Sequence, residues 1–172
     1  MKLVIDTSAL VSLEIMDCLE RTLATYEVFI TQEISQELHE MADYKDVEGQ
    51  AAKRTLKKIK KYNVKIEKCN FKDYKRFITK GVDRGEASAF YLCIKKGIKR
   101  FITDDVDASF TLKPLAKTEN IKLRICVAIV IDLIDQNLIS KKEAYNNIRK
   151  LIKVRGWESG VLEVMIERYL RK

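Results

Sequence analysis

The sequence contains few of the residues that build loops, zinc sites or disulfide frameworks. Its 172 residues include one proline, six glycines, one histidine and four cysteines. So little proline and glycine argues against a low-complexity or loop-rich chain. The four cysteines form no C-x-x-C pair, and structural zinc sites need such close ligand pairs, so we do not expect a zinc site. We therefore expect reduced, packed thiols, which are typical of a cytosolic protein.

Long uncharged apolar runs are also missing. The longest, "ICVAIVI" from Ile125, is far shorter than the ~20 residues that span a bilayer. The N-terminus lacks the pattern of a cleavable signal peptide, and no phosphate-loop or dinucleotide-binding glycine motif occurs anywhere. These absences predict a cytoplasmic protein that has no membrane contact and is not a nucleotide-binding enzyme of those classes.

Charge is abundant. Charged residues make up 34% of the chain, and the net charge is +8. A basic surface favours phosphate-rich partners, although lysine-rich compositions also occur in thermostable proteins with no nucleic-acid role. The hydrophobic share of 47% is ordinary, and a single domain of this length buries roughly two-thirds of its unfolded surface. The composition thus predicts one domain and supports a nucleic-acid partner without proving it.

Strand and helix patterns alternate along most of the chain. The predicted strands are 2–6, 26–31, 64–68, 99–105 and 122–127. The predicted helices are 7–16, 32–42, 47–62, 71–79, 85–97, 108–117, 128–136, 141–153 and 159–171. Thr7 or Ser8 is the expected cap of the first helix, Gly97 ends the helix that starts at Gly85, and Pro114 breaks the helix 108–117. This alternation is typical of an α/β domain with a mainly parallel sheet and helices on both faces.

Acidic residues fall where the predicted strands end. Asp6 follows the first strand, Asp104 and Asp105 follow "RFIT", and Asp107 comes two residues later. Ligands of open α/β sheets bind beyond the carboxyl ends of the strands. An unpaired carboxylate is costly to bury, so Asp6 is the hardest of these acids to explain structurally. "TDD" is also compatible with a turn, and Asp107 with a helix cap.

Two helical acids are placed to join them. Glu37 lies beside Leu38, next to an apolar stripe, and Glu86 is aligned with the apolar positions of its own helix. Glu33 and Glu40 are expected to be solvated. Carboxylates that converge must take up protons or recruit a cation, and Mg²⁺ and Mn²⁺ prefer oxygen ligands. The pattern therefore predicts an acidic pocket that binds a divalent metal and suits a phosphodiester substrate.

The chain resembles the PIN domain, the nuclease fold of VapC-type toxins and related ribonucleases. Four blocks carry the resemblance, in the family's order: "VIDTSALVSL", "FITQEISQELHE", "GEASAFYLCIKKG" and "RFITDDVDASF". The resemblance implies a three-layer α/β/α PIN-like core over residues 1–131. It also implies that residues 132–172 form a C-terminal helical extension packed on the same domain.

The resemblance also implies roles for individual residues. The catalytic acids would be Asp6, Glu37, Glu86 and Asp105, with Ser8 assisting through hydrogen bonding. The metal ligands would come from Asp6, Glu86, Asp104, Asp105 and Asp107. Asp105 is favoured among the last three, and the choice between them stays open.

By the same resemblance, the protein would be a Mg²⁺- or Mn²⁺-dependent endoribonuclease. It would form a homodimer and belong to a VapBC-type pair with a small antitoxin. The alternative is a catalytically inactive PIN-like module that binds RNA or protein. An aspartyl phosphatase is less favoured because it needs a second Asp two residues after the first, where Ser8 stands.

Possible RNA contacts come from the predicted helix 47–62. Lys53, Lys57 and Lys60 share one side of it and could guide a phosphate backbone. A solvated amphipathic face explains the same pattern. Tyr44 and Tyr62 flank this helix and are candidates for stacking on unpaired bases.

Overall fold

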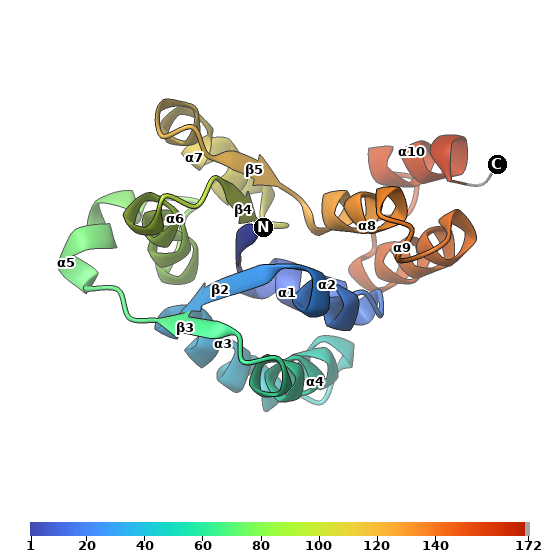
Figure 1. Ribbon diagram of the computed structural model, residues 1–172, viewed down its shortest axis with the longest axis horizontal. Coiled ribbons are helices and arrows are strands. Elements are labelled where there is room, and N and C mark those ends of the chain that lie inside the picture. Colours follow the sequence, from blue (N-terminus) through green and yellow to red (C-terminus); the bar gives the residue numbers. More distant parts are fainter. Residues whose placement is uncertain (171–172) are drawn as a thin grey trace.

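Five parallel strands form the centre of the computed structural model, which describes residues 1–170 (Figure 1). The strands are β1 (Lys2–Ile5), β2 (Glu27–Thr31), β3 (Lys65–Glu67), β4 (Arg100–Ile102) and β5 (Lys122–Arg124). Their order in the sheet is β3-β2-β1-β4-β5, and every neighbouring pair is parallel. Val4 of the middle strand pairs with Phe29 on one side and Phe101 on the other. The carboxyl ends of β1 and β4 therefore lie side by side, as the sequence predicted.

Helices cover both faces of this sheet and confirm the predicted three-layer α/β/α fold. They are α1 (Thr7–Ile15), α2 (Leu19–Thr25), α3 (Gln32–Ala42), α4 (Val47–Lys61), α5 (Phe71–Tyr74), the 3-10 turn η1 (Lys75–Phe77), α6 (Arg84–Lys96), α7 (Val106–Thr118), α8 (Cys126–Asp135), α9 (Lys141–Arg155) and α10 (Val161–Tyr169). In Figure 1, α6 lies on one side of the strands, while α1, α2, α8 and α9 lie on the other.

Helix α1 is buried on almost every side. It packs against α4, α8 and α9 on the sheet's surface, and every residue from Ala9 to Ile15 is buried. A helix that is apolar all round belongs in a core, which explains why "ALVSLEI" shows no polar face. Its one buried acid, Glu14, pairs with Arg54 and Lys58 of α4 at 2.8 Å each. These ion pairs tie the C-terminal end of α1 to α4.

Two local predictions were wrong. Helix α2 was not expected, because seven residues without a side-chain cap give no recognisable period. Helix α7 is not broken at Pro114 but runs through it from Val106 to Thr118. Pro114 is exposed, so solvent can satisfy the carbonyl that loses its helical hydrogen bond. Gly97, by contrast, ends α6 in the left-handed conformation (φ 64°), as predicted.

The C-terminal helices continue the same body. Helix α9 packs against α1 and α8, and α10 packs against α9. The predicted boundary at residue 131 lies inside α8, so the division into core and extension stays a prediction. The last helix, predicted over 159–171, is observed as α10 and ends at Tyr169. Position 171 lies outside the described residues. Within residues 1–170, no helix combines the length and the apolar character needed to cross a membrane.

Candidate active site

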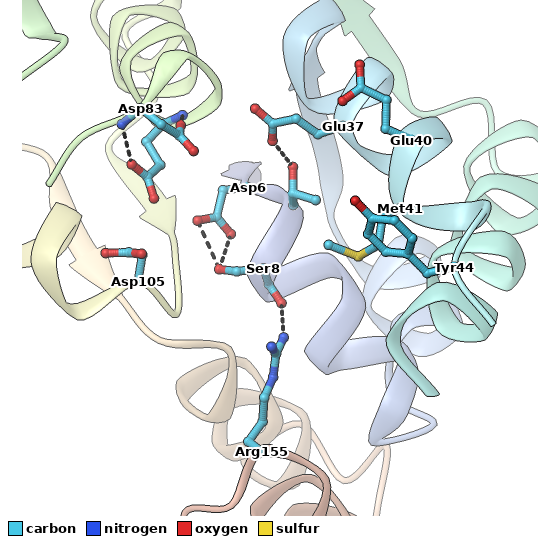
Figure 2. A pocket seen from close by; sticks show the side chains of 11 residues that line it. Asp6, Ser8, Glu37, Glu40, Met41, Tyr44, Asp83, Asp105 and Arg155 are labelled. Atoms are coloured by element: carbon cyan, nitrogen blue, oxygen red, sulfur yellow. Dashed lines mark hydrogen bonds between the residues drawn. The ribbon is translucent and has the colours of Figure 1, made fainter. Parts of the chain in front are cut away.

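A pocket of about 340 Å³ opens at the carboxyl ends of β1 and β4 (Figure 2). Most of the side chains around it are acidic. The lining residues are Asp6, Thr7, Ser8, Glu37, Glu40, Met41, Tyr44, Asp83, Glu86, Asp105 and Arg155. The structure thus brings together all four predicted catalytic acids, which come from four different segments of the chain.

Asp6 lies at the centre of the pocket and is 3% exposed. It is the N-cap of α1, because its Oδ1 accepts a hydrogen bond from the amide of Ala9 at 2.8 Å. The expected cap at Thr7 or Ser8 was therefore wrong: the helix begins one residue earlier, and aspartate is among the best N-cap residues. Its backbone amide donates to the Ile102 carbonyl at 3.0 Å, which ties the end of β1 to β4.

Ser8 connects Asp6 to the end of β4. Its hydroxyl donates to the Asp6 carboxylate at 3.0–3.1 Å and accepts from the Asp104 amide at 3.1 Å. Thr103 also hydrogen-bonds to Asp6 through its side chain, and its hydroxyl accepts from the Asp105 amide at 3.1 Å. Two hydroxyls therefore fix the Asp6 carboxylate relative to the segment that carries Asp105.

Burial dominates the electrostatics of Asp6. Burial raises the pKa of Asp6 to about 7, and the negative charge of Asp104 adds to this increase. The hydrogen bonds from Thr103 and Ala9 lower the pKa but do not outweigh burial. A carboxylate with this pKa is half protonated near neutral pH. Burial, more than the charge of neighbouring acids, therefore favours the protonated form of Asp6.

Glu86 reaches the pocket from the first turn of α6. It forms a capping box with Asp83: the Glu86 amide donates to Asp83 Oδ1 at 2.9 Å, and the Asp83 amide donates to Glu86 Oε2 at 2.8 Å. Burial raises the pKa of Glu86 to about 8, and the charges of Asp83, Asp105 and Asp6 contribute. Asp83 was missed as a pocket residue, although the D-x-x-E spacing of "DRGE" is a capping-box signature.

Glu37 faces the pocket from α3. The Thr7 hydroxyl donates to its Oε2 at 2.5 Å, and burial raises its pKa, with Asp83 and Glu40 adding negative charge. Its carboxylate lies directly over Gly85 of α6: a Cβ placed there would be 2.2 Å from Oε1. Gly85 therefore leaves the space that the Glu37 carboxylate occupies, a role that no sequence pattern revealed.

The three acids after β4 point in different directions. Asp105 lines the pocket and caps α7, with its Oδ1 accepting from the Ala108 amide at 2.7 Å. Asp104 instead accepts from the Cys126 amide at 2.8 Å, at the start of α8. Asp107 is exposed and lines only an adjoining pocket that also includes Glu86 and Asp105. The N-cap of α7, considered in the sequence analysis for Asp107, is Asp105. Of the three acids, Asp105 is also the one that lines the pocket.

Three of the predicted metal ligands, Asp6, Glu86 and Asp105, line this pocket from three different segments of the chain. The negative charges of Asp105 and Asp6, together with that of Asp83, help to raise the pKa of Glu86. Among residues 1–170, no three His, Cys, Asp or Glu side chains already converge on one metal position. The donor chemistry nevertheless fits Mg²⁺ or Mn²⁺, since the set contains oxygen ligands only. In this arrangement, protons on Asp6 and Glu86 would have to be displaced as the ion binds.

The rest of the pocket wall was less predictable. Met41 and the 61%-exposed Tyr44 form its apolar side, and Arg155 reaches it from α9 (Figure 2). Tyr62 does not line it and instead donates its hydroxyl to Glu20 at 2.7 Å. Glu40 is exposed, as expected, whereas Glu33 accepts a 2.7 Å hydrogen bond from Tyr74 and is half-buried.

The predicted RNA-contacting lysines lie away from the pocket. Lys53, Lys57 and Lys60 are all exposed on α4. Their neighbours Arg54 and Lys58 turn inward to Glu14. The three lysines are thus available for contact with a phosphate backbone, and that role stays a prediction.

Comparison with known families decides the classification of the chain. A family model described as a PIN domain matches residues 2–169, almost the whole sequence. The chain belongs to the PIN-domain family. No curated protein matches it. The PIN fold is a nuclease-type fold whose members generally use divalent metals, which agrees with an acidic pocket at the carboxyl edge of the sheet.

The contact between Gly85 and Glu37 of this PIN domain leads to a testable prediction. In Gly85→Ala the added methyl group must push the Glu37 carboxylate away from Thr7. We expect nuclease activity to fall by up to about 10²-fold, the cost of a misplaced catalytic group. Thermal stability should not fall, because alanine is a better helix residue than glycine. Cleavage rates and thermal denaturation measure both effects.

A double-mutant comparison provides the control. If Gly85→Ala acts through Glu37, it should cause no further loss in a Glu37→Ala background. Additive losses in the double variant would contradict this explanation.

Proposed function

We propose that this PIN domain is a Mg²⁺- or Mn²⁺-dependent endoribonuclease that hydrolyses RNA phosphodiester bonds in the acidic pocket. The observation that carries the proposal is the meeting of Asp6, Glu37, Glu86 and Asp105 in one pocket of a PIN fold. The net charge of +8 supports a nucleic-acid substrate, because 33 basic residues outnumber 25 acidic ones and an excess of positive charge attracts phosphates.

Asp6, Glu86 and Asp105 would hold the divalent ion through their carboxylate oxygens. When bound, such an ion would neutralise phosphate charge and make nearby water more acidic. Ser8 and Thr103 keep the Asp6 carboxylate in place through their hydroxyls. Orientation by a fixed second layer of hydrogen bonds is a common requirement of metal sites.

Glu37 is suited to proton transfer. Its pKa is raised by burial, and one carboxylate oxygen is fixed by Thr7 while the other lies over Gly85. A carboxylate whose pKa lies closer to neutrality exchanges protons more efficiently at physiological pH. We assign it the role of accepting or returning a proton during hydrolysis.

The test is incubation of the purified protein with single-stranded RNA of mixed sequence, with Mn²⁺, with Mg²⁺ or with chelator. The proposal predicts internal cleavage with either metal and none with chelator. Absence of cleavage under all three conditions would overturn it.

The inactive alternative makes a different prediction. A PIN-like module that only binds RNA or protein needs no metal, so titration calorimetry with Mn²⁺ should show no specific binding. The proposed nuclease should bind Mn²⁺ in its acidic pocket. The complete set of four acids favours the nuclease.

The family membership also suggests a biological setting. We propose a cytoplasmic VapC-like toxin that forms a homodimer and is held inactive by a small antitoxin. Light scattering of the purified protein tests the dimer. Co-purification with a small acidic protein that suppresses RNA cleavage tests the antitoxin, and a chain that purifies alone and does not inhibit cell growth would contradict the toxin role.

A further inference from the structure

The C-terminal helix α9 places an arginine in the acidic pocket. Arg155 is the last residue of α9, and among the described residues lining the pocket it is the single base. Figure 2 shows its side chain extending toward the Ser8 carbonyl, on the opposite side of Ser8 from the Asp6 carboxylate. A substrate phosphate that enters between carboxylates is repelled by them and needs a cation to offset this repulsion. Arg155 is the basic residue in the pocket wall that can supply this positive charge.

The hydrogen bonds of Arg155 do not use all of its donors. One terminal nitrogen donates to the Ser8 carbonyl at 3.4 Å and to the Ser12 hydroxyl at 3.2 Å, and the other donates to Glu48 Oε1 at 2.5 Å. An arginine has five N–H donors. The Nε–H is buried and has no hydrogen-bond acceptor among the described residues. One terminal N–H also has no acceptor among them. The side chain is 20% exposed and forms part of the pocket wall.

From this geometry we infer that Arg155 is a phosphate-binding residue, through which the C-terminal extension completes the substrate site. The inference rests on the proposed nuclease function, because it takes an RNA phosphate as the ligand. The guanidinium is held by α1 and α4 in a fixed direction, and a planar fork of donors suits phosphate oxygens better than a flexible ammonium group. Hydrogen bonds to Ser8 and Ser12 of α1 fix the position of the guanidinium. Its ion pair with Glu48 partly neutralises its positive charge.

The competing explanation is that Arg155 only ties α9 to α1 and α4. The two explanations make opposite predictions for Glu48→Gln. A structural tie would be weakened by loss of its ion pair, so RNA binding would weaken as it does in Arg155→Gln. A phosphate-binding arginine would be released from a competing carboxylate, so RNA binding would stay equal or become tighter.

The experiment measures binding of a short fluorescein-labelled single-stranded RNA in Mn²⁺ buffer, with Asp6→Asn as the common background to prevent cleavage. Arg155→Gln is expected to weaken binding about tenfold, the effect of a hydrogen bond to a charged group. The slope of log affinity against log salt should decrease by about 0.7, which corresponds to one phosphate contact on a single strand. A DNA strand of the same sequence should show the same loss, because the guanidinium contacts phosphate alone.

Lys153→Gln is the matched control, since it removes one positive charge from an exposed position of the same helix. It should weaken binding clearly less than Arg155→Gln. Equal effects of the two variants, or a weakening by Glu48→Gln as large as that by Arg155→Gln, would overturn the inference. If Arg155→Gln does not fold, as judged by thermal denaturation, the direction of the Glu48→Gln effect decides by itself.

Failure of the inference can be separated from failure of the proposed function. Wild-type protein that does not cleave RNA refutes the nuclease but leaves the binding comparison intact. Wild-type protein that cleaves RNA, with Arg155→Gln binding as well as Lys153→Gln, refutes the role of Arg155 alone.

Discussion

Replacing Asp6 with asparagine is expected to lower Mn²⁺-dependent RNA cleavage by on the order of 10³-fold, the scale of losing a preorganised charged group at an active site. Asparagine keeps the shape and an oxygen that can accept from the Ala9 amide, so the cap of α1 survives. It loses the charge that would hold a divalent ion. Initial cleavage rates of a fluorescent RNA measure this effect.

The same substitution should not destabilise the fold. Because burial raises the pKa of Asp6 to about 7, its ionised form opposes folding at higher pH. The associated stability is present below the unfolded-state pKa of about 3.8 and is lost as the pH rises through about 7. At pH 8 without metal, Asp6→Asn should therefore unfold at the same temperature as the wild type or at a higher one.

Asp43→Asn is a suitable control, because Asp43 is exposed at the end of α3. It should leave both cleavage and stability close to wild type. Full activity of Asp6→Asn would remove Asp6 from the catalytic set, and loss of its cooperative thermal transition would show that the residue is mainly structural.

Binding of Mn²⁺ should depend steeply on pH. Asp6 and Glu86 have pKa values raised to about 7 and about 8, and a metal ion must displace their protons. Below pH 7, the apparent affinity for Mn²⁺ should fall about tenfold per pH unit for each proton displaced. Calorimetry between pH 6 and pH 9 tests this, as does the heat of proton release in buffers of different ionisation enthalpy.

Thermal denaturation gives an independent reading. Without metal, the raised pKa values of both acids mean that stability decreases as the pH rises from about 4 to about 8. If Mn²⁺ binds the folded protein with the pocket acids ionised, it should raise the melting temperature more at pH 8 than at pH 6. A metal effect that is the same at both pH values, and that persists in Asp6→Asn, would place the ion outside this pocket.

The meeting of four acids in the pocket was predictable from the sequence, because each is marked by local features. Asp6 and Asp105 follow strands, and Glu37 and Glu86 lie next to the apolar stripes of helices. Parallel pairing of β1 with β4 then brings the strand ends together. The order of elements and the three layers followed from the same alternation of strand and helix patterns.

Directions of neighbouring side chains were not predictable. Asp104 and Asp105 are adjacent in sequence, yet the first points to the start of α8 and the second into the pocket. That difference arises from the turn between β4 and α7, in which the Asp105 amide is held by Thr103. Turns of this kind depend on tertiary contacts that a strand-and-helix pattern does not contain.

Arg155 was missed for another reason. It is separated from Ser8 by 147 positions, and "KVRGW" has no motif that sets this arginine apart from the many basic residues of the chain. Its place depends on how α9 packs on α1, which is a property of the completed fold.

This separation has a consequence for synthesis of the protein. Asp6 leaves the ribosome long before the helix that carries Arg155. The wall of the pocket is incomplete until α9 has emerged and packed against α1. A nascent chain stalled before that point, or a product truncated within α9, would carry all four carboxylates proposed to be catalytic and still lack the arginine. If Arg155 serves substrate binding, the order of translation would delay full activity of the proposed nuclease until α9 has been made.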